Sequence, residues 1–316
     1  MYLKLVLDSC WKSYNAERMY GSAMPYIKLG NIEQFLAPLP SLSEQKRIVE
    51  EIEKIFGQIE VVKENQEELS KLKDGLKNKI LDLAIQGKLV EQDPNDEPAS
   101  VLLEKIKIEK AELIKQGKIK KDKQESYIYK GTDNRHYEKI GSEVRDITDE
   151  IPFEIPSSWS WCRLGSAFNI ILGQSPDGNS VNETNGIEFH QGKVFFSDKY
   201  LNKSNQYTTK PSKLVQKDTV LLCVRAPVGV VNITQRDICI GRGLAGIDNI
   251  AGISSDFVYY WLQAHKNEFI SKATGTTFIA ITGDVIQNQL IPLPPLLEQR
   301  RIIEKIIKFY ENIRLS

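Results

Sequence analysis

Apolar residues recur at every seventh position along much of the first third of the chain. They are Ile48, Ile55, Val62, Leu69, Leu76 and Leu83, with Ile52, Ile59 and Ile80 at a companion position. A seven-residue spacing sustained over this length predicts one long helix with a coiled-coil seam. Ser41 or Ser43 can cap its start, and Gly87 suits its end. We therefore expect a helix from Leu42 to Gln86, which would be about 67 Å long.

The phrase that opens this predicted helix occurs twice in the chain. Residues 38–50 read PLPSLSEQKRIVE and residues 292–304 read PLPPLLEQRRIIE, an offset of 254 residues (292 minus 38). A repeat of domain-sized period indicates a duplicated module rather than a solenoid. Its prolines favour an extended approach to each helix. Because so long a helix cannot bury its seam on itself, we expect an antiparallel partner helix that begins at the second phrase.

The segments outside the predicted spacer helix differ from it in pattern. At the same offset, residues 1–37 align with the end of the second module, so we expect a remnant of a domain whose front is missing. Residues 88–150 are charged, and we interpret them as a helical or flexible linker. Within it, residues 100–116 have a helical pattern, and residues 127–149 are expected to be flexible.

Residues 151–291 carry short β-rich runs separated by glycine, proline and aspartate turn signals. The expected strands cover residues 168–172, 193–196, 219–225 and 228–233, and a helix is expected over 257–269. This pattern predicts an α+β fold, in which a mixed α/β domain is combined with long coiled-coil spacer helices. We expect residues 292–316 to form a second spacer helix that is truncated relative to the first.

Composition and charge exclude several classes of protein. The 316 residues include 42 basic and 42 acidic side chains, so nucleic-acid binding would have to depend on local patches. The four cysteines lack Cys-x-x-Cys spacing and are typical of free thiols in a reducing compartment. The N-terminal apolar run is too short for a signal peptide, and no stretch has the length of a membrane span. We expect a cytoplasmic protein.

The repeated phrase resembles a known family. Pro-Leu-Pro-x-Leu-x-Glu-Gln-Lys/Arg-Arg-Ile at the start of a long helix is similar to the spacers in specificity (S) subunits of type I restriction–modification enzymes. The sequence IPSSWSW at 155–161, followed by Arg163-Leu164-Gly165, resembles the start of a target-recognition domain in that family. The resemblance covers nearly the whole chain, and it makes 151–291 a complete target-recognition domain and 1–37 the C-terminal remnant of a first one.

The resemblance implies a non-catalytic subunit that reads one half of a bipartite site in double-stranded DNA. It also implies that methyltransferase (M) subunits dock on the spacer helices and that the restriction (R) subunit joins through them. The M subunits of the family methylate adenine with S-adenosylmethionine, so no cofactor and no metal are expected in this chain. One complete recognition domain departs from the family's two. We therefore expect a truncated or recombined subunit, which either self-associates as two S chains or is an inactive recombination product.

Two readings of a different class remain open. Pro176-Asp177 and Gln191-Gly192-Lys193 resemble the Pro-Asp…Gln-x-Lys pattern of metal-dependent nucleases. However, a second carboxylate is missing, Pro-Asp-Gly is also an ordinary turn, and the three histidines show no metal-ligand spacing. A nuclease is therefore the least supported alternative, no catalytic residue is expected, and a coiled-coil adaptor without DNA readout is the other alternative.

A polar and basic stretch is the best candidate for contact with DNA. Between Lys193 and Arg242 there are nine basic and three acidic residues, a local excess of six positive charges, with Asn, Gln and Thr interleaved. Such a mixture suits contact with phosphates and base edges, although a solvated loop would have the same composition. The candidate DNA contacts are Gln174, Ser175, Gln191, Lys193, Lys199, Lys203, Tyr207, Lys210, Lys213, Arg225 and Arg242.

Three loops in this domain are the candidates for base reading. They carry Gln174 with Ser175, Gln191, and Arg242. Gly241 and Gly243 flank Arg242, and they would either allow close approach to a ligand or serve a tight structural turn.

Overall fold

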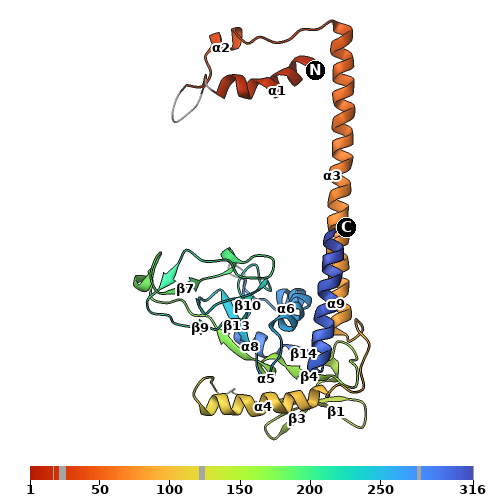
Figure 1. Ribbon diagram of the computed structural model, residues 1–316, viewed down its shortest axis with the longest axis vertical. Coiled ribbons are helices and arrows are strands. Elements are labelled where there is room, and N and C mark those ends of the chain that lie inside the picture. Colours follow the sequence, from red (N-terminus) through yellow and green to blue (C-terminus); the bar gives the residue numbers. More distant parts are fainter. Residues whose placement is uncertain (17, 21–25, 121–124, 276–278, 316) are drawn as a thin grey trace. The chain divides into compact units, whose positions relative to one another are not determined.

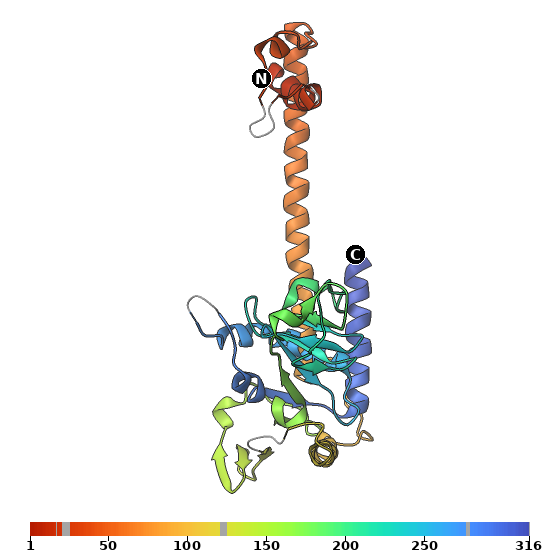
Figure 2. The same cartoon turned by 90° about the vertical axis from the view of Figure 1, so that its left-hand side faces the viewer.

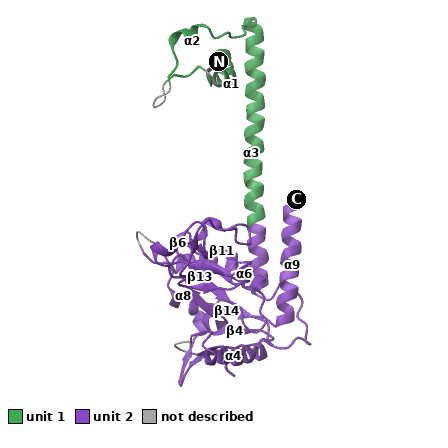
Figure 3. Cartoon of the chain, turned by 60° about the vertical axis from the view of Figure 1, so that its left-hand side comes forward, with its two compact units in different colours: residues 1–74 green, residues 75–316 purple. Residues whose placement is uncertain are grey.

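The structure is a computed structural model that describes residues 1–16, 18–20, 26–120, 125–275 and 279–315. The chain divides into two compact units, Met1–Asp74 and Gly75–Ser316 (Figure 3). Residues 17 and 21–25 of the predicted N-terminal remnant, and 121–124 of the predicted linker, lie outside the described residues. Among the described helices, none combines the length and the apolar character that a membrane span requires.

The described residues of unit 1 form two helices and most of a third (Figure 1). They are α1 (Tyr2–Ala16), α2 (Leu29–Glu33) and the part of α3 (Leu42–Ile85) that precedes residue 75. The helix start has the predicted cap, because the Glu44 backbone N–H donates to Ser41 Oγ at 3.3 Å. The long helix predicted from the heptad pattern is confirmed. It ends at Ile85, and Gly87 follows with φ +68°, a conformation that favours glycine.

The heptad seam of α3 is exposed in unit 1. The exposed fractions are 45% for Ile55, 53% for Val62 and 46% for Leu69. A seam of this kind is normally covered by a second helix, and the described residues of the chain leave this one open. A coiled-coil partner for this part of α3 therefore stays a prediction.

The end of α3 belongs to unit 2, where the last helix of the chain packs against it. That helix is α9 (Leu296–Leu315). Ile302 and Ile306 share an apolar cluster with Leu81, whereas Tyr310 lies farther along α9, beside Lys77. The two helices therefore run antiparallel here, as Figure 2 shows. The partner helix predicted at the second phrase is thus present for residues 75–85 of α3.

The second phrase also binds the segment that follows α3. Glu298 is buried and accepts hydrogen bonds from Trp159 Nε1 at 2.9 Å and Gln92 Nε2 at 2.5 Å. Burial raises the pKa of Glu298, although both hydrogen bonds act in the opposite direction. Arg301 forms an ion pair with Asp96 at 2.5 Å. Residues of the second phrase therefore begin α9 and also attach it to the segment after α3 and to Trp159 near the start of the mixed domain.

The mixed α/β domain predicted from the sequence is present and contains two larger sheets. One has the antiparallel strand order β11-β10-β13-β5, with β5 (Asn169–Leu172), β10 (Val220–Cys223), β11 (Val231–Ile233) and β13 (Leu244–Asp248). The other has the order β6-β8-β7-β12-β9, with β6 (Val181–Asn182), β7 (Ile187–His190), β8 (Tyr207–Thr208), β9 (Leu214–Val215) and β12 (Ile238–Ile240). β7 and β12 are parallel, so their carboxyl ends lie at the same edge.

The rest of this domain closes around those sheets. β4 (Ser160–Arg163) pairs antiparallel with β14 (Leu290–Leu293), which leads into α9. The helices are α5 (Leu164–Ala167), α6 (Ser255–Ala264), α7 (Lys266–Ser271) and α8 (Gly283–Gln287), with short 3-10 turns at Thr148–Glu150, Gly178–Ser180 and Lys193–Phe195. Most of α6 is buried and joins the main hydrophobic core, to which α9 also contributes.

Two predicted elements of this domain are wrong in detail. Residues 193–196 were expected to be a strand, but Lys193–Phe195 is a 3-10 turn. The helix expected over 257–269 is interrupted at His265, between α6 and α7. Apolar content suggested regular structure in both places, whereas local turn geometry decided its type.

The expectation that residues 127–149 are flexible is also wrong. After α4 (Ala99–Lys115), an antiparallel sheet is formed by β1 (Ser126–Lys130), β2 (His136–Ile140) and β3 (Glu143–Asp146). Ile128 and Ile147 pack with Trp161 and Leu290, so a few well-spaced apolar residues attach this polar segment to β4 and β14. Successive side chains of a strand point to opposite faces of a sheet, so a few apolar residues are enough to bury one face even where the overall composition is charged.

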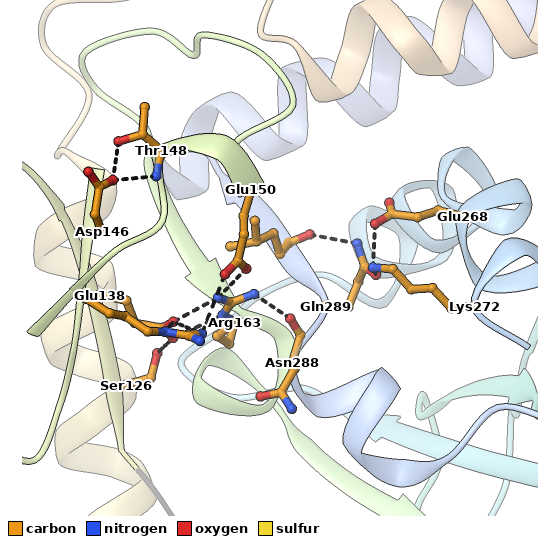
Figure 4. A network of polar contacts seen from close by, with 12 residues as sticks. Ser126, Glu138, Asp146, Thr148, Glu150, Arg163, Glu268, Lys272, Asn288 and Gln289 are labelled. Carbon is orange, nitrogen blue, oxygen red and sulfur yellow. Dashed lines mark hydrogen bonds and ion pairs between the residues drawn. The ribbon is translucent and has the colours of Figure 1, made fainter. Parts of the chain in front are cut away.

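A buried ion pair completes the attachment of this sheet (Figure 4). The Glu138 side chain on β2 is 1% exposed and the Arg163 side chain on β4 is 7% exposed, with Nη2 and Oε2 2.8 Å apart. Arg163 also bonds Glu150 at 2.8 Å and the Asn288 carbonyl at 2.8 Å. Burial by itself would raise the pKa of Glu138, but hydrogen bonds from Arg163, Ser126 and Arg145 lower it to about 2.

Arg163→Met is expected to destabilise unit 2 by about 3–5 kcal/mol, because it leaves the Glu138 carboxylate buried without its main partner. Urea unfolding followed by tryptophan fluorescence measures the change. Arg135→Met is the matched control, since Arg135 forms an exposed ion pair with Asp146, and it should cost no more than about 1 kcal/mol. Equal losses in the two variants would contradict the structural role of Arg163.

Candidate nucleic-acid interface

The three loops predicted to read bases lie together in the structure. They follow the carboxyl ends of β5, β7 and β12 and are joined through backbone hydrogen bonds. Gly241 N–H donates to the His190 carbonyl at 2.8 Å, and Gly243 N–H donates to the Gln191 carbonyl at 3.1 Å. Gln174 N–H donates to the Ile240 carbonyl at 3.1 Å. Loops that are far apart in sequence therefore form one continuous surface, which sequence spacing alone could not show.

The glycines of this surface allow the loops to approach one another. A Cβ on Gly173 would overlap the Gly241 and Leu244 carbonyls, and a Cβ on Gly243 would overlap the Gln191 carbonyl. A Cβ on Gly241 would overlap the carboxamide of Gln191. Of the two roles considered for Gly241 and Gly243, tight packing within the protein is the one that their surroundings explain.

Polar side chains stand on this surface and face solvent. Gln174, Gln191 and Arg242 are exposed, and Ser175 is half-buried. Ser175 Oγ donates to Gln191 Oε1 at 2.8 Å, which links two of the candidates directly. Arg242 forms no hydrogen bond or ion pair with another described residue, so its five N–H donors are available.

Several of the predicted basic residues lie along or beside the same loops. Lys193 is exposed at the start of the 3-10 turn that follows Gln191. Lys213 is half-buried, and its carbonyl accepts the Ile240 N–H at 2.9 Å, beside the Gln174 contact. Arg225 is exposed and follows Val224, whose N–H donates to the Gly243 carbonyl. The backbone at these three residues thus lies on, or next to, the loops that carry Gln191 and Arg242.

The remaining candidates lie on neighbouring elements. Lys210 is exposed just after β8, two residues before Ser212, whose hydroxyl donates to the Gln174 carbonyl. Lys203 is exposed in the loop before β8, and Tyr207 is half-buried in β8 opposite Glu188. Among the described residues, neither Lys203 nor Tyr207 forms a hydrogen bond or ion pair with Gln191 or Arg242.

Lys199 has a structural environment that differs from that of the other candidates. Its ammonium group pairs with Asp256 of α6 at 2.9 Å, and its side chain is only 20% exposed. The same group lies 5.3 Å from the ring centroid of Tyr260 and 5.8 Å from that of Tyr259. Since an ion pair and aromatic faces already hold this charge, Lys199 anchors its loop to α6 and is a poor donor for a phosphate.

Sequence reasoning missed the ion pair between the buried Glu188 and the half-buried Arg236. Arg236 bonds both carboxylate oxygens of Glu188, at 2.5 and 2.6 Å, and the carbonyls of Leu201 and Asn202. Burial would raise the pKa of Glu188, but the hydrogen bonds from Arg236 and the Ser204 N–H lower it to about 2. No sequence signal marks this pair, because both residues suit an exposed position equally well.

These pairings reduce the local excess of positive charge. Glu188 and Asp256 lie outside the stretch from 193 to 242 and neutralise Arg236 and Lys199, so the excess of six falls to four. Of the basic residues that remain, Lys193, Lys213 and Arg225 lie on or next to the Gln191 and Arg242 loops, which makes this part of the surface the better candidate for phosphate contact.

The nuclease-like pattern has a structural explanation. Asp177 caps the 3-10 turn Gly178–Ser180 by accepting the Asn179 N–H at 3.1 Å, which is the turn role considered from the sequence. Within the described residues, no group of three or more His, Cys, Asp or Glu side chains has an arrangement that could hold a metal ion.

Comparison with known proteins relates both units to one family. A family model described as the type I restriction modification DNA specificity domain matches residues 2–71 and 156–316. The putative type I restriction enzyme MjaX specificity subunit of Methanocaldococcus jannaschii is 44% identical over 48% of this chain and 37% of its own length. The type I restriction enzyme EcoAI specificity subunit of Escherichia coli is 31% identical over 74% of this chain and 39% of its own length. The chain thus spans less than half the length of these curated relatives.

Solved structures give the same relationship. The HsdS subunit from Thermoanaerobacter tengcongensis has a TM-score of 0.52 at 26% identity, over 99% of this chain and 63% of that one. A chain from a study of complex assembly and conformational transition of the type I R-M system has a TM-score of 0.61 at 28% identity, over 98% of this chain and 62% of that one. The mixed fold with a long helix is therefore shared with these proteins.

Lys199→Ala is expected to lower the free energy of unfolding by about 1–2 kcal/mol, because it removes the Asp256 ion pair and the aromatic contacts together. Lys203→Ala, at an exposed position in the same loop region, should change it by no more than about 0.5 kcal/mol. Chemical unfolding of the two variants measures the difference. A Lys199→Ala protein as stable as the Lys203→Ala control would show that the anchor is dispensable.

Proposed function

The chain belongs to the type I restriction–modification DNA specificity family, and from this membership we propose that it is a non-catalytic subunit that recognises one half of a bipartite DNA site. The observation that carries the proposal is the single surface formed by the loops after β5, β7 and β12. It displays Gln174, Gln191 and Arg242 to solvent. Amide and guanidinium groups are the side chains that bind base edges in the major groove.

Basic side chains around this surface suit the phosphate backbone. Lys193, Lys210 and Arg225 are exposed, and Lys213 is half-buried beside the Gln174 loop. Contacts with phosphates position a protein on duplex DNA without reading its sequence. Lys203 is exposed in the loop before β8 and fits the same phosphate role. Lys199 is left out, because Asp256 already compensates its charge.

The exposed seam of α3 is the second element of the proposal. Large apolar side chains at Ile55, Val62 and Leu69 have no cover among the described residues. An amphipathic helix with an open seam binds another helix in a coiled-coil manner. We assign this seam to methyltransferase subunits, through which the restriction subunit would join, and self-association of two S chains would use the same face.

A coiled-coil adaptor without DNA readout is the second candidate function, and the open seam of α3 is the observation that favours it. The two functions differ in their behaviour toward DNA. An adaptor would bind its protein partners but would show no sequence preference, whereas a specificity subunit needs both the seam and the loop surface.

Binding to duplex DNA is expected to weaken steeply as salt rises, because phosphate contacts release counterions.

Arg242→Ala should relax preference at one base position, by about 1–3 kcal/mol. Lys210→Ala should weaken all duplexes alike and lower the salt slope by about one. Fluorescence anisotropy over a salt series, with the purified chain alone and together with methyltransferase subunits, measures both. Affinity that depends on neither salt nor sequence would leave the adaptor as the function.

Leu69→Glu is expected to abolish co-purification with methyltransferase subunits, because it places a charge in the seam. Ser70→Glu is the matched control. It adds the same charge at the adjacent exposed position, which lies off the heptad seam, and it should leave the complex intact. Circular dichroism of both variants checks that α3 remains helical. Retention of the complex in Leu69→Glu would place the docking surface elsewhere.

A further inference from the structure

The carboxamide of Gln191 is held in one orientation by two neighbours. Ser175 Oγ donates a hydrogen bond to Gln191 Oε1 at 2.8 Å. The same oxygen lies against Gly241, 2.2 Å from the position that a Cβ would occupy if Gly241 had one. The oxygen is therefore enclosed by the protein on two sides, although the Gln191 residue as a whole is exposed.

This enclosure determines which part of the amide faces solvent. An amide group is planar, and its oxygen and nitrogen point in different directions from the same carbon. Because Oε1 points toward Ser175 and Gly241, the Nε2 group points away from them and presents its two N–H donors. Arg242, next to Gly241, adds only donors, since a guanidinium group has no acceptor. The Gln191 amide nitrogen and the Arg242 guanidinium thus offer hydrogen-bond donors without acceptors.

We propose that Ser175 is a specificity-positioning residue that makes Gln191 a donor-only reader of DNA. The inference rests on the proposed DNA-recognition function and adds the chemical class of base edge that the surface accepts. A free glutamine reads adenine with both groups, since its oxygen accepts from N6 and its nitrogen donates to N7. Ser175 Oγ occupies one acceptor direction of Oε1 and Gly241 covers another side, so that pairing is lost. Adenine then offers the Nε2 donors one acceptor, N7, beside the N6 donor group, whereas guanine offers two acceptors, N7 and O6, and the thymine edge offers O4 without a donor group. The Gln191 position therefore favours guanine or thymine over adenine.

The Ser175 hydroxyl is well placed for this role because its own loop is fixed. The preceding residue, Gln174, is bonded through its N–H to Ile240, and Gly173 N–H donates to the Leu244 carbonyl at 3.0 Å. The backbone before Ser175 is therefore held in place, and it would not move with the Gln191 side chain if the carboxamide rotated. Removal of the hydroxyl frees the glutamine oxygen and restores its ability to accept from adenine N6.

The test is competition binding with duplexes in which each position of the half-site is varied through all four bases. Wild-type protein, alone and with methyltransferase subunits, should discriminate against adenine at the position where Gln191→Ala flattens the preference. Ser175→Ala should reduce that discrimination by about tenfold, the lower part of the range for one base contact. Ser175→Thr keeps the hydroxyl and should keep the preference.

Ser271→Ala is the matched control, because it removes an exposed serine hydroxyl on α7, away from the three loops. If Gln191→Ala changes one base preference while Ser175→Ala changes none, Ser175 does not position Gln191 and the inference is overturned. It is equally overturned if Gln191→Ala has no effect in a protein that still binds selectively. If the wild-type protein binds no duplex selectively, the proposed function itself fails.

Discussion

The packing of α9 against the end of α3 and against α6 is the contact on which the rest of unit 2 depends. Ile302, Ile306 and Trp261 are buried in one core with Leu81. Each large apolar side chain removed from water contributes about 1.5–3 kcal/mol. Because β14 leads directly into α9 and pairs with β4, the same contact closes the mixed domain around its first strand.

Polar groups in unit 2 determine which arrangement that apolar core adopts. Glu298 is buried, yet it is bonded to Trp159 and Gln92, so only one placement of the linker leaves it satisfied. Glu138 and Arg163 act in the same way between β2 and β4. Such pairs add little net stability, because desolvation offsets their attraction, but a wrong arrangement would leave a charge buried without a partner.

The loop surface illustrates how a rigid scaffold serves recognition. Backbone hydrogen bonds join the loops after β5, β7 and β12 to one another, so few side chains are needed to fix the conformation of these loops. Gln191 and Arg242 are therefore available for a partner. Arg236 and Lys199 instead hold neighbouring loops in place, through ion pairs with Glu188 and Asp256. Basic residues with similar surroundings in sequence thus have different roles: Arg242 is exposed to solvent, whereas Arg236 and Lys199 are half-buried and form ion pairs.

The sequence by itself determined the long helix, the duplicated phrase and the mixed character of residues 151–291, because heptad spacing, proline punctuation and β-rich runs are local signals. It also indicated the three loops that carry Gln174, Gln191 and Arg242. Only the tertiary structure decided that these loops meet, that residues 127–149 form a sheet, and that Arg236 pairs with Glu188. The physical reason is that burial and pairing join residues far apart in the chain, and no local pattern records which charge will find its partner.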